Sequence, residues 1–152
     1  MKLISLLEKL EYTCLQGSTD QEVKNVIYDS RKVEEGSLFI CIRGAVVDGH
    51  KFVPDVVAKG AKVLIVEEAV EAPEDVTVIL VKDTRYAMAF ISAAYFGYPA
   101  EKLKTIGITG TKGKTTTTYM VKSILENAGY KVGLIGTIEA IIGDKVIPAK
   151  NT

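Results

Sequence analysis

The chain has no tryptophan, one histidine, four prolines and two cysteines among its 152 residues. Cys14 and Cys41 have neither the spacing of a metal-binding cysteine pair nor that of a Cys-x-x-Cys redox motif, which excludes zinc-finger and disulfide-stapled classes. Both cysteines are expected in or near the core as small apolar side chains. The cysteine usage therefore indicates a protein of a reducing compartment.

Neither an excess of charge nor a long apolar run is present. Acidic and basic residues number 19 each, so nothing in the net charge points to nucleic acid or to an anionic membrane surface. No apolar run reaches the roughly 18 residues of a membrane-spanning helix. The first ten residues carry Lys2, Glu8 and Lys9 among leucines, which is typical of an amphipathic helix and not of a signal peptide. We expect a cytoplasmic protein without nucleic-acid binding or membrane insertion.

The most informative stretch is residues 105–118, TIGITGTKGKTTTT. The apolar run at 106–108 predicts a buried parallel strand, and apolar residues at helical spacing after Lys114 predict a helix to about residue 128. Between them, Gly110 and Gly113 allow the backbone N–H groups to approach phosphate oxygens, and the helix N-terminus adds partial positive charge. The stretch therefore predicts a cradle for the phosphates of a nucleotide.

The predicted roles in this cradle follow from side-chain chemistry. Lys114 is expected to stabilise the terminal phosphates, and the Thr115 hydroxyl is expected to ligate the Mg²⁺ that accompanies ATP. The spacing is not a full Walker A motif, which would place glycine five residues before Gly113, where the chain has Ile108. A surface turn is the structural alternative, and the flanking strand and helix argue against it. The expected ATP-binding residues are Gly110, Thr111, Lys112, Gly113, Lys114, Thr115 and Thr116.

The rest of the chain alternates between helical and strand patterns, which predicts an α/β fold with a mixed or parallel sheet and flanking helices. Helices are expected at residues 2–10, 51–59 and 84–96, and strands at 23–28, 37–42, 62–66 and 77–81. Tyr98-Pro99 interrupts this pattern, so we predict a domain at 1–98 and a linker at 99–104. Residues 105–152, with strands at 132–135, 138–142 and 145–147, are expected to be the incomplete start of a P-loop ATPase-type α/β domain.

Several polar residues have an ordinary structural interpretation. His50, the lone histidine, is more often a loop or helix-start hydrogen-bonding residue than a catalyst. Asp29 and Arg31 could pair or cap a turn, or Arg31 could contact a ligand. Residues 67–68, both glutamate, and the acidic residues of 71–75 are expected in a solvated loop and not in a metal cluster.

Taken together, the motifs resemble the Mur ligases, ATP-dependent amide-bond-forming enzymes of peptidoglycan precursor synthesis. The loop at 110–116 is similar to their ATP loop, with Lys112 where asparagine is more usual. Four upstream segments also resemble motifs of the family and occur in the same order: Asp29-Ser30-Arg31, Gly36-Ser37-Leu38-Phe39, Asp48-Gly49-His50-Lys51-Phe52 and Lys59-Gly60-Ala61. The run at 133–138, followed by Asn151-Thr152, resembles the MurE-type branch, the UDP-N-acetylmuramoyl-tripeptide synthetases.

The resemblance implies a substrate and the residues that contact it. Residues 1–98 would be a UDP-substrate-binding domain that holds the UDP end of UDP-N-acetylmuramoyl-L-alanyl-D-glutamate. Ser30 matches the family's nucleotide-contacting serine, and Tyr28 and the turn at 45–47 fall where the family contacts uridine. Polar residues are common in that turn, whereas this chain has Ala-Val-Val. Asn151 and Thr152 match the start of an Asn-Thr-Thr motif that touches the substrate.

The resemblance also implies a reaction. The γ-phosphoryl group of ATP would pass to the D-glutamate carboxylate, and the amine of diaminopimelate or lysine would displace phosphate from the acyl phosphate. Lys114 would be the catalytic residue that stabilises the transferred group. The acidic metal ligands, a carbamylated lysine and the domain that selects the amino acid would lie beyond residue 152. Residues 1–152 alone are therefore expected to be inactive, and the full-length enzyme is expected to be a monomer.

Two other classes of function stay open from sequence. Residues 112–116 followed by 129–135 also resemble ParA-like switch ATPases, although those have Lys-Gly-Gly in the loop and an aspartate soon after the second strand. The chain has Gly-Thr-Lys and then Gly136-Thr137 at these places. The other alternative is a UDP-sugar-binding module without catalysis.

Overall fold

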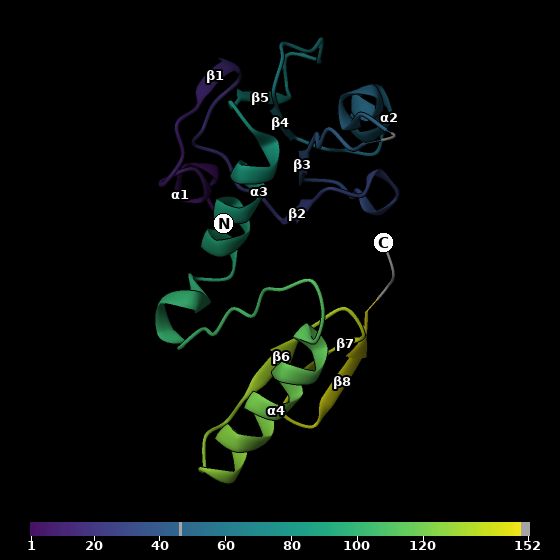
Figure 1. Cartoon of the computed structure of the whole chain (residues 1–152). Coiled ribbons are helices and arrows are strands. Elements are labelled where there is room, and N and C mark those ends of the chain that lie inside the picture. The colour runs from purple at the N-terminus through teal and green to yellow at the C-terminus, as the bar shows by residue number, and fades with distance from the viewer. Residues whose placement is uncertain (46, 150–152) are drawn as a thin grey trace. The chain divides into compact units, whose positions relative to one another are not determined.

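The computed structural model describes residues 1–45 and 47–149. The chain divides into two compact units, with the boundary in the sequence between Leu103 and Lys104 (Figure 1). The first unit contains a five-stranded mixed sheet with the strand order β1-β5-β4-β3-β2. Strands β2 to β5 are parallel, and β1 is antiparallel to β5 at the edge. The strands are β1 (Thr13–Gln16), β2 (Asn25–Ile27), β3 (Ser37–Ile40), β4 (Val63–Val66) and β5 (Thr77–Leu80).

The two central strands are apolar because the sheet is covered on both faces. All four residues of β3 and all four of β4 are buried. Successive side chains point to opposite faces, so Leu38 and Ile40 pack in one hydrophobic cluster and Phe39 and Cys41 in the other. Helices α1 (Leu3–Leu6) and α3 (Thr84–Tyr95) contribute to the first cluster, and α2 (Val53–Ala58) contributes to the second. The first unit is therefore a three-layer sandwich.

Aspartates set the starts of three helical segments. Asp29, Asp48 and Asp83 each accept a backbone N–H two residues ahead. The segments that they begin are the 3₁₀-helices η1 (Ser30–Lys32) and η2 (Gly49–Phe52) and the helix α3. Asp83 caps α3 with its side chain, and Pro54 lies in the first turn of α2, where its missing N–H costs no hydrogen bond.

The first unit differs from the predictions in its first helix, in one edge strand and at Cys14. The first helix ends at Leu6 and not at residue 10, because the chain turns there so that Leu7 packs in the core. Strand β1 was not predicted, since an exposed edge strand such as TCLQ lacks an alternating apolar pattern. Cys14, which lies in this strand, is exposed, whereas Cys41 is buried as expected. Residues 99–102 of the predicted linker form the 3₁₀-helix η3 (Pro99–Lys102).

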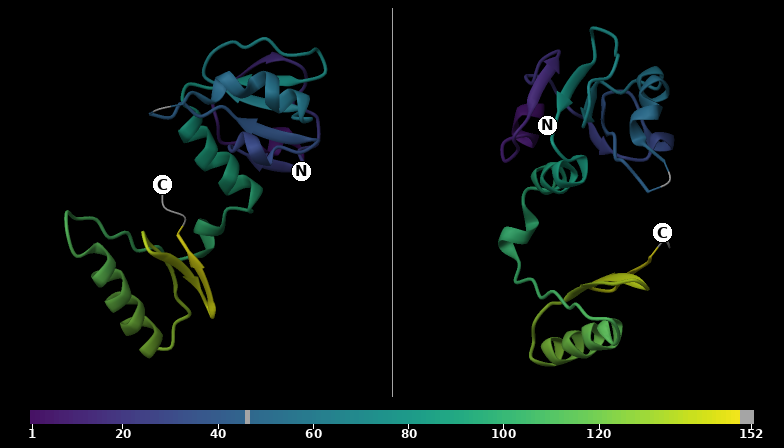
Figure 2. Two further views of the ribbon diagram at one scale, coloured as in Figure 1. Left: turned by 90° about the vertical axis from the view of Figure 1, so that its right-hand side faces the viewer. Right: turned by 45° about the horizontal axis from the view of Figure 1, so that its top comes forward.

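The second unit packs one helix against a three-stranded antiparallel sheet (Figure 2). Its elements are α4 (Lys114–Asn127), β6 (Gly133–Ile135), β7 (Glu139–Ile142) and β8 (Lys145–Pro148). The helix and the later strands agree with the predictions. The strand predicted at 106–108 is absent, and Ile106 is exposed, because no other strand in the described part of this unit pairs with it.

Within the described residues, no helix is both long enough and apolar enough to cross a membrane.

Candidate functional site

The glycine loop leads directly into the first turn of α4. Gly113 occupies the N-cap position with φ +79°, a left-handed conformation that disfavours any residue with a side chain. The N–H groups of residues 114–116 have no acceptor within the helix because they lie in its first turn, and Gly113 has no side chain that could accept from them. A Cβ atom at position 113 would meet nothing within 4 Å. The loop therefore presents free donors toward open space.

Some polar side chains near the start of α4 form hydrogen bonds to the backbone, and others do not. The Lys114 ammonium donates to the Gly110 carbonyl at 2.7 Å, which folds the lysine back over the loop. The hydroxyl of Thr117 bonds to the Gly113 carbonyl, and that of Thr118 bonds to a carbonyl one turn earlier. The hydroxyls of residues 115 and 116 have no partner among the described residues.

These features fit the triphosphate of ATP. Free backbone donors at a helix N-terminus bind phosphate oxygens, and the helix dipole favours the negative charge. Lys112 and Lys114 are both exposed and add two cations within three residues. A hydroxyl at the second helical position, that of Thr115, is the chemical type that completes a magnesium shell beside a phosphate.

Deeper in the second unit, Tyr119 of α4 donates a hydrogen bond to the Glu139 carboxylate of β7, and this contact raises the pKa of Tyr119. This bond ties the helix that begins at the glycine loop to the sheet beneath it.

A second group of candidate residues lies at the carboxyl edge of the first sheet, after β2. Tyr28 is exposed, and Ser30 begins η1 with its carbonyl bonded to the Lys59 ammonium at 2.9 Å. Asp29 caps the turn and also pairs with the Arg31 guanidinium, and these contacts lower the pKa of Asp29 to about 2. Arg31 thus has a structural role in the turn, which was one of its two predicted interpretations.

The turn after β3 lies at the same edge, because β2 and β3 are parallel neighbours. Its ends are paired through the bridge between Arg43 and Asp48, and the Gly44 N–H donates to the Val47 carbonyl at 2.9 Å. The predicted uridine-contacting turn at 45–47 is the tip of this loop, and Val46 lies outside the described residues.

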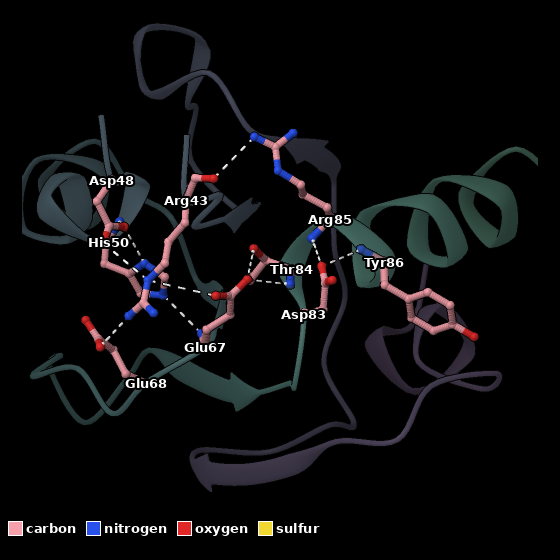
Figure 3. Close-up of polar contacts among 9 residues, drawn as sticks. All are labelled: Arg43, Asp48, His50, Glu67, Glu68, Asp83, Thr84, Arg85 and Tyr86. Carbon is pink, nitrogen blue, oxygen red and sulfur yellow. Dashed lines mark hydrogen bonds and ion pairs between the residues drawn. The ribbon is translucent and has the colours of Figure 1, made fainter. Parts of the chain in front are cut away.

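Side chains from three loops meet at the base of this turn (Figure 3). The Arg43 guanidinium pairs with Asp48 and Glu68 and lies 3.8 Å from a Glu67 oxygen. His50 is almost fully buried, and its Nδ1 lies 2.6 Å from Asp48 Oδ1. Its Nε2 accepts the Glu67 N–H at 3.0 Å. The neutral ring with a proton on Nδ1 satisfies both contacts.

Glu67 links this group to the next helix. One of its carboxylate oxygens accepts both the N–H and the hydroxyl of Thr84, at 2.8 and 2.7 Å. Arg85, in the same first turn of α3, donates to the Arg43 carbonyl at 3.2 Å. The prediction of a solvated acidic loop is therefore wrong for Glu67, whose carboxylate is bonded within the fold. It is confirmed for Glu68 and for the acidic residues of 71–75, which are exposed.

Asp48, His50 and Glu68 have the donor atoms of a metal site within 4.8 Å of one another. Both ring nitrogens of His50 already have partners, however, and the Arg43 guanidinium pairs with both carboxylates. A cation is therefore already present where a metal would be needed, and the cluster is an ion-pair network. His50 is a hydrogen-bonding residue, as its sequence context predicts.

Asn151 and Thr152, the remaining predicted substrate residues, lie outside the described residues. The predicted ATP residues 110–116 form the glycine loop and the first turn of α4. Tyr28 and Ser30 lie at the same sheet edge as the turn at 45–47. Sequence reasoning missed Arg43 and Glu67. The only local signal was the Asp-Gly-His sequence after Arg43, since the carboxylates that complete the network are far along the chain.

Comparison with known proteins assigns both units. Residues 22–96 match the Mur ligase family, catalytic domain, and residues 108–152 match the Mur ligase middle domain. The chain belongs to the Mur ligase family. The switch-ATPase alternative has no support from these matches, because both units belong to one ligase family.

Similar Mur ligases include the UDP-N-acetylmuramoyl-L-alanyl-D-glutamate--2,6-diaminopimelate ligase of Clostridium perfringens, which is 53% identical over 152 residues, 100% of this chain and 31% of the relative. The enzyme of the same name from Clostridium tetani is 48% identical over 100% of this chain and 32% of its own length. The chain thus spans about a third of the length of the curated relatives it matches.

Solved Mur ligase structures share the fold. MurF from Acinetobacter baumannii is 35% identical, with a TM-score of 0.67 over 83% of this chain and 27% of that chain. A structure named for UDP-N-acetylmuramoyl-L-alanyl-D-glutamate--2,6-diaminopimelate ligase covers 100% of this chain and 31% of its own, with a TM-score of 0.75 at 23% identity. MurF from Thermotoga maritima, solved in complex with ADP, has a TM-score of 0.52, 26% identity and 69% coverage of this chain and 24% of its own.

Proposed function

We propose that this Mur ligase chain is part of an ATP-dependent ligase that adds the third residue, diaminopimelate, to UDP-N-acetylmuramoyl-L-alanyl-D-glutamate. The observation that carries the proposal is the identity of 53% along the whole chain to a ligase named for that reaction. MurF structures are similar over a smaller share of the chain and at lower identity. The choice of diaminopimelate over lysine rests on the names of the relatives, because residues 1–152 are not expected to include the domain that selects the amino acid.

The first unit would hold the UDP end of the substrate at the carboxyl edge of its sheet. Loops that follow neighbouring parallel strands form the usual ligand crevice of α/β sheets. Tyr28 offers an exposed aromatic ring to a base, and Ser30 offers a hydroxyl two residues later. The apolar tip at 45–47 would contact the uridine through backbone groups and methyl surface. Asn151 and Thr152 would add contacts from the middle domain.

The second unit would bind the phosphates of Mg-ATP through residues 110–116. Magnesium, held in part by Thr115, would supply charge neutralisation between the phosphates. Lys114 would leave the Gly110 carbonyl and stabilise the charge on the transferred phosphoryl group. Lys112 would add a second cation to the loop.

The wider setting belongs to the same proposal. UDP-N-acetylmuramoyl-dipeptide, ATP and a free amino acid are its small-molecule partners, and the proposal needs no nucleic acid and no membrane insertion. A cytoplasmic location follows from these partners, because ATP and nucleotide-linked precursors are supplied there. We propose a monomeric full-length enzyme.

The test is ATP-dependent phosphate release by the full-length protein with the UDP-dipeptide and either diaminopimelate or lysine. Phosphate release that requires the UDP-dipeptide and diaminopimelate supports the proposal, and lysine should be a poor replacement. Lys114→Ala should abolish turnover without lowering the melting temperature, because among the described residues its ammonium bonds to a single exposed loop carbonyl. ATP hydrolysis that is independent of both substrates would contradict the proposal and favour a switch ATPase.

A further inference from the structure

Side-chain contacts from Arg43, Asp48 and His50 hold both ends of the turn at 43–48. We propose that Arg43 and His50 are positioning residues that fix this turn in the conformation that receives the nucleotide end of the substrate. The inference rests on the function proposed above and adds to it two residues that do not touch the ligand.

Arg43 anchors one end of the turn through both its backbone and its side chain. Its carbonyl accepts the Arg85 guanidinium from α3, and its own guanidinium pairs with Glu68 from the loop after β4. The same guanidinium reaches Asp48 at 3.3 Å, which closes the turn across its ends. One residue therefore joins the loops that follow three neighbouring strands (Figure 3).

His50 anchors the other end. Its Nδ1 and its backbone N–H both contact Asp48 Oδ1, at 2.6 and 3.0 Å. Its Nε2 accepts the N–H of Glu67, so that Asp48 is tied to the end of β4. Between them, Gly49 passes so close to the preceding segment that a Cβ atom would lie 2.7 Å from the Ile42 nitrogen. The base of the turn is therefore fixed, whereas Val47 near its tip is 48% exposed.

The charges show why Arg43 positions the turn and does not bind phosphate. Its guanidinium faces Asp48, Glu67 and Glu68, so three carboxylates surround one cation. This excess of negative charge would repel a diphosphate, and the Nε and Nη2 atoms of Arg43 already pair with carboxylates. Ala45 and Val47, which are exposed, and not the network, offer the surface that remains for a ligand.

The experiment compares variants of this 152-residue chain by calorimetric titration with UDP and with UDP-N-acetylmuramoyl-L-alanyl-D-glutamate. Arg43→Gln removes the central cation, and Glu68→Gln is a milder change that removes one exposed partner. Lys62→Gln is the matched control, because it breaks an exposed ion pair with Asp75 just before β4, at the opposite edge of the same sheet. If about one tenth of the Arg43→Gln molecules hold the turn in its binding conformation, the Kd should rise about tenfold. Glu68→Gln should show a smaller rise and Lys62→Gln less than twofold.

Amide hydrogen exchange separates positioning from general destabilisation. In Arg43→Gln, two amides should exchange faster: that of Gly44, which bonds to Val47 within the turn, and that of Gly49, which bonds to Ile42 at its base. The amides of β4 should keep their wild-type rates. In the full-length enzyme, the KM for the UDP-dipeptide should rise while kcat and the KM for ATP stay unchanged, and Arg43→Lys should recover part of the loss.

The outcomes are distinguishable. If the wild-type chain binds neither UDP ligand, the proposed function fails for this unit and the inference falls with it. If the wild type binds but Arg43→Gln and Glu68→Gln bind equally well, the positioning role is overturned while the proposed function stands. If affinity falls only in step with faster exchange across β4, Arg43 supports the whole unit and the inference is likewise overturned. Should Arg43→Gln fail to fold, the same criteria apply to Glu68→Gln.

Discussion

Glu67 is the residue through which the end of β4 supports the start of α3, so its removal should destabilise the first unit. The perturbation is Glu67→Ala. One Glu67 oxygen accepts two bonds from Thr84, which is fully buried, and the Asp83 cap bonds to the N–H groups of residues 85 and 86 and not to that of Thr84. Truncation therefore leaves a buried N–H and a buried hydroxyl without their acceptor.

The magnitude follows from these two bonds. A hydrogen bond to a charged acceptor contributes about 1.5 to 3 kcal/mol, and an unsatisfied buried donor costs a similar amount. Because both bonds end on one oxygen, we expect a loss of about 3 kcal/mol in the free energy of unfolding for Glu67→Ala. Glu67→Gln keeps a carbonyl oxygen for Thr84 and should lose about 1 kcal/mol. Glu68→Ala, the adjacent control, removes only an exposed ion pair and should lose less than about 1 kcal/mol.

The assay is native-state hydrogen exchange of the amides in β4, which lies at the centre of the first sheet and reports on this unit alone. A loss of about 3 kcal/mol corresponds to exchange that is faster by roughly a hundredfold. Glu67→Ala with the same exchange rates as Glu68→Ala would refute the reasoning, because the capping bonds to Thr84 would then contribute nothing measurable.

Further predictions concern single groups. Burial raises the pKa of Cys41 to about 12, so a thiol-alkylating reagent followed by mass spectrometry should label exposed Cys14 in the native chain and Cys41 only after unfolding. The backbone and side chain of His50 lower the pKa of Asp48, so its stabilising contribution is complete above its unfolded pKa of about 3.9 and is lost as the pH falls through the lower folded value. Urea denaturation should accordingly show a flatter acid limb for Asp48→Asn, and a limb as steep as that of the wild type would count against the network. Gly113→Ala should cost about 1 kcal/mol in thermal unfolding because of its positive φ, and it should weaken Mg-ATP binding; unchanged affinity would argue against the loop geometry.

The sequence was most informative where a short local pattern is compatible with a single local structure. The runs at 37–40 and 63–66 are apolar throughout because both faces of the sheet are covered, and Asp83 caps α3 because its carboxylate reaches N–H groups two and three residues ahead. The glycine loop was predicted from a motif whose conformation is also local. Strand β1 has no such pattern, because an exposed edge strand is held by backbone pairing with its neighbour β5 and not by buried side chains.

The site network could not be predicted, because its partners are distant in the sequence. Arg43 pairs with Glu68, which lies 25 residues away, and Glu67 caps Thr84 from 17 residues away. Nothing in the sequence around Glu67 distinguishes it from its exposed neighbour. The strand expected at 106–108 was wrong although its apolar pattern is typical of a strand. A strand also needs a neighbour to pair with, and the local pattern does not show whether one is present.

The most direct test of the central claim is calorimetric titration of this chain with UDP-N-acetylmuramoyl-L-alanyl-D-glutamate, with Ser30→Ala as the variant and Lys114→Ala as the control. We expect binding that weakens in Ser30→Ala and is unchanged in Lys114→Ala, because the two residues lie in different units. A chain that binds Mg-ATP but not the UDP-dipeptide, or binding that Ser30→Ala leaves intact, would contradict the assignment of the first unit to this substrate.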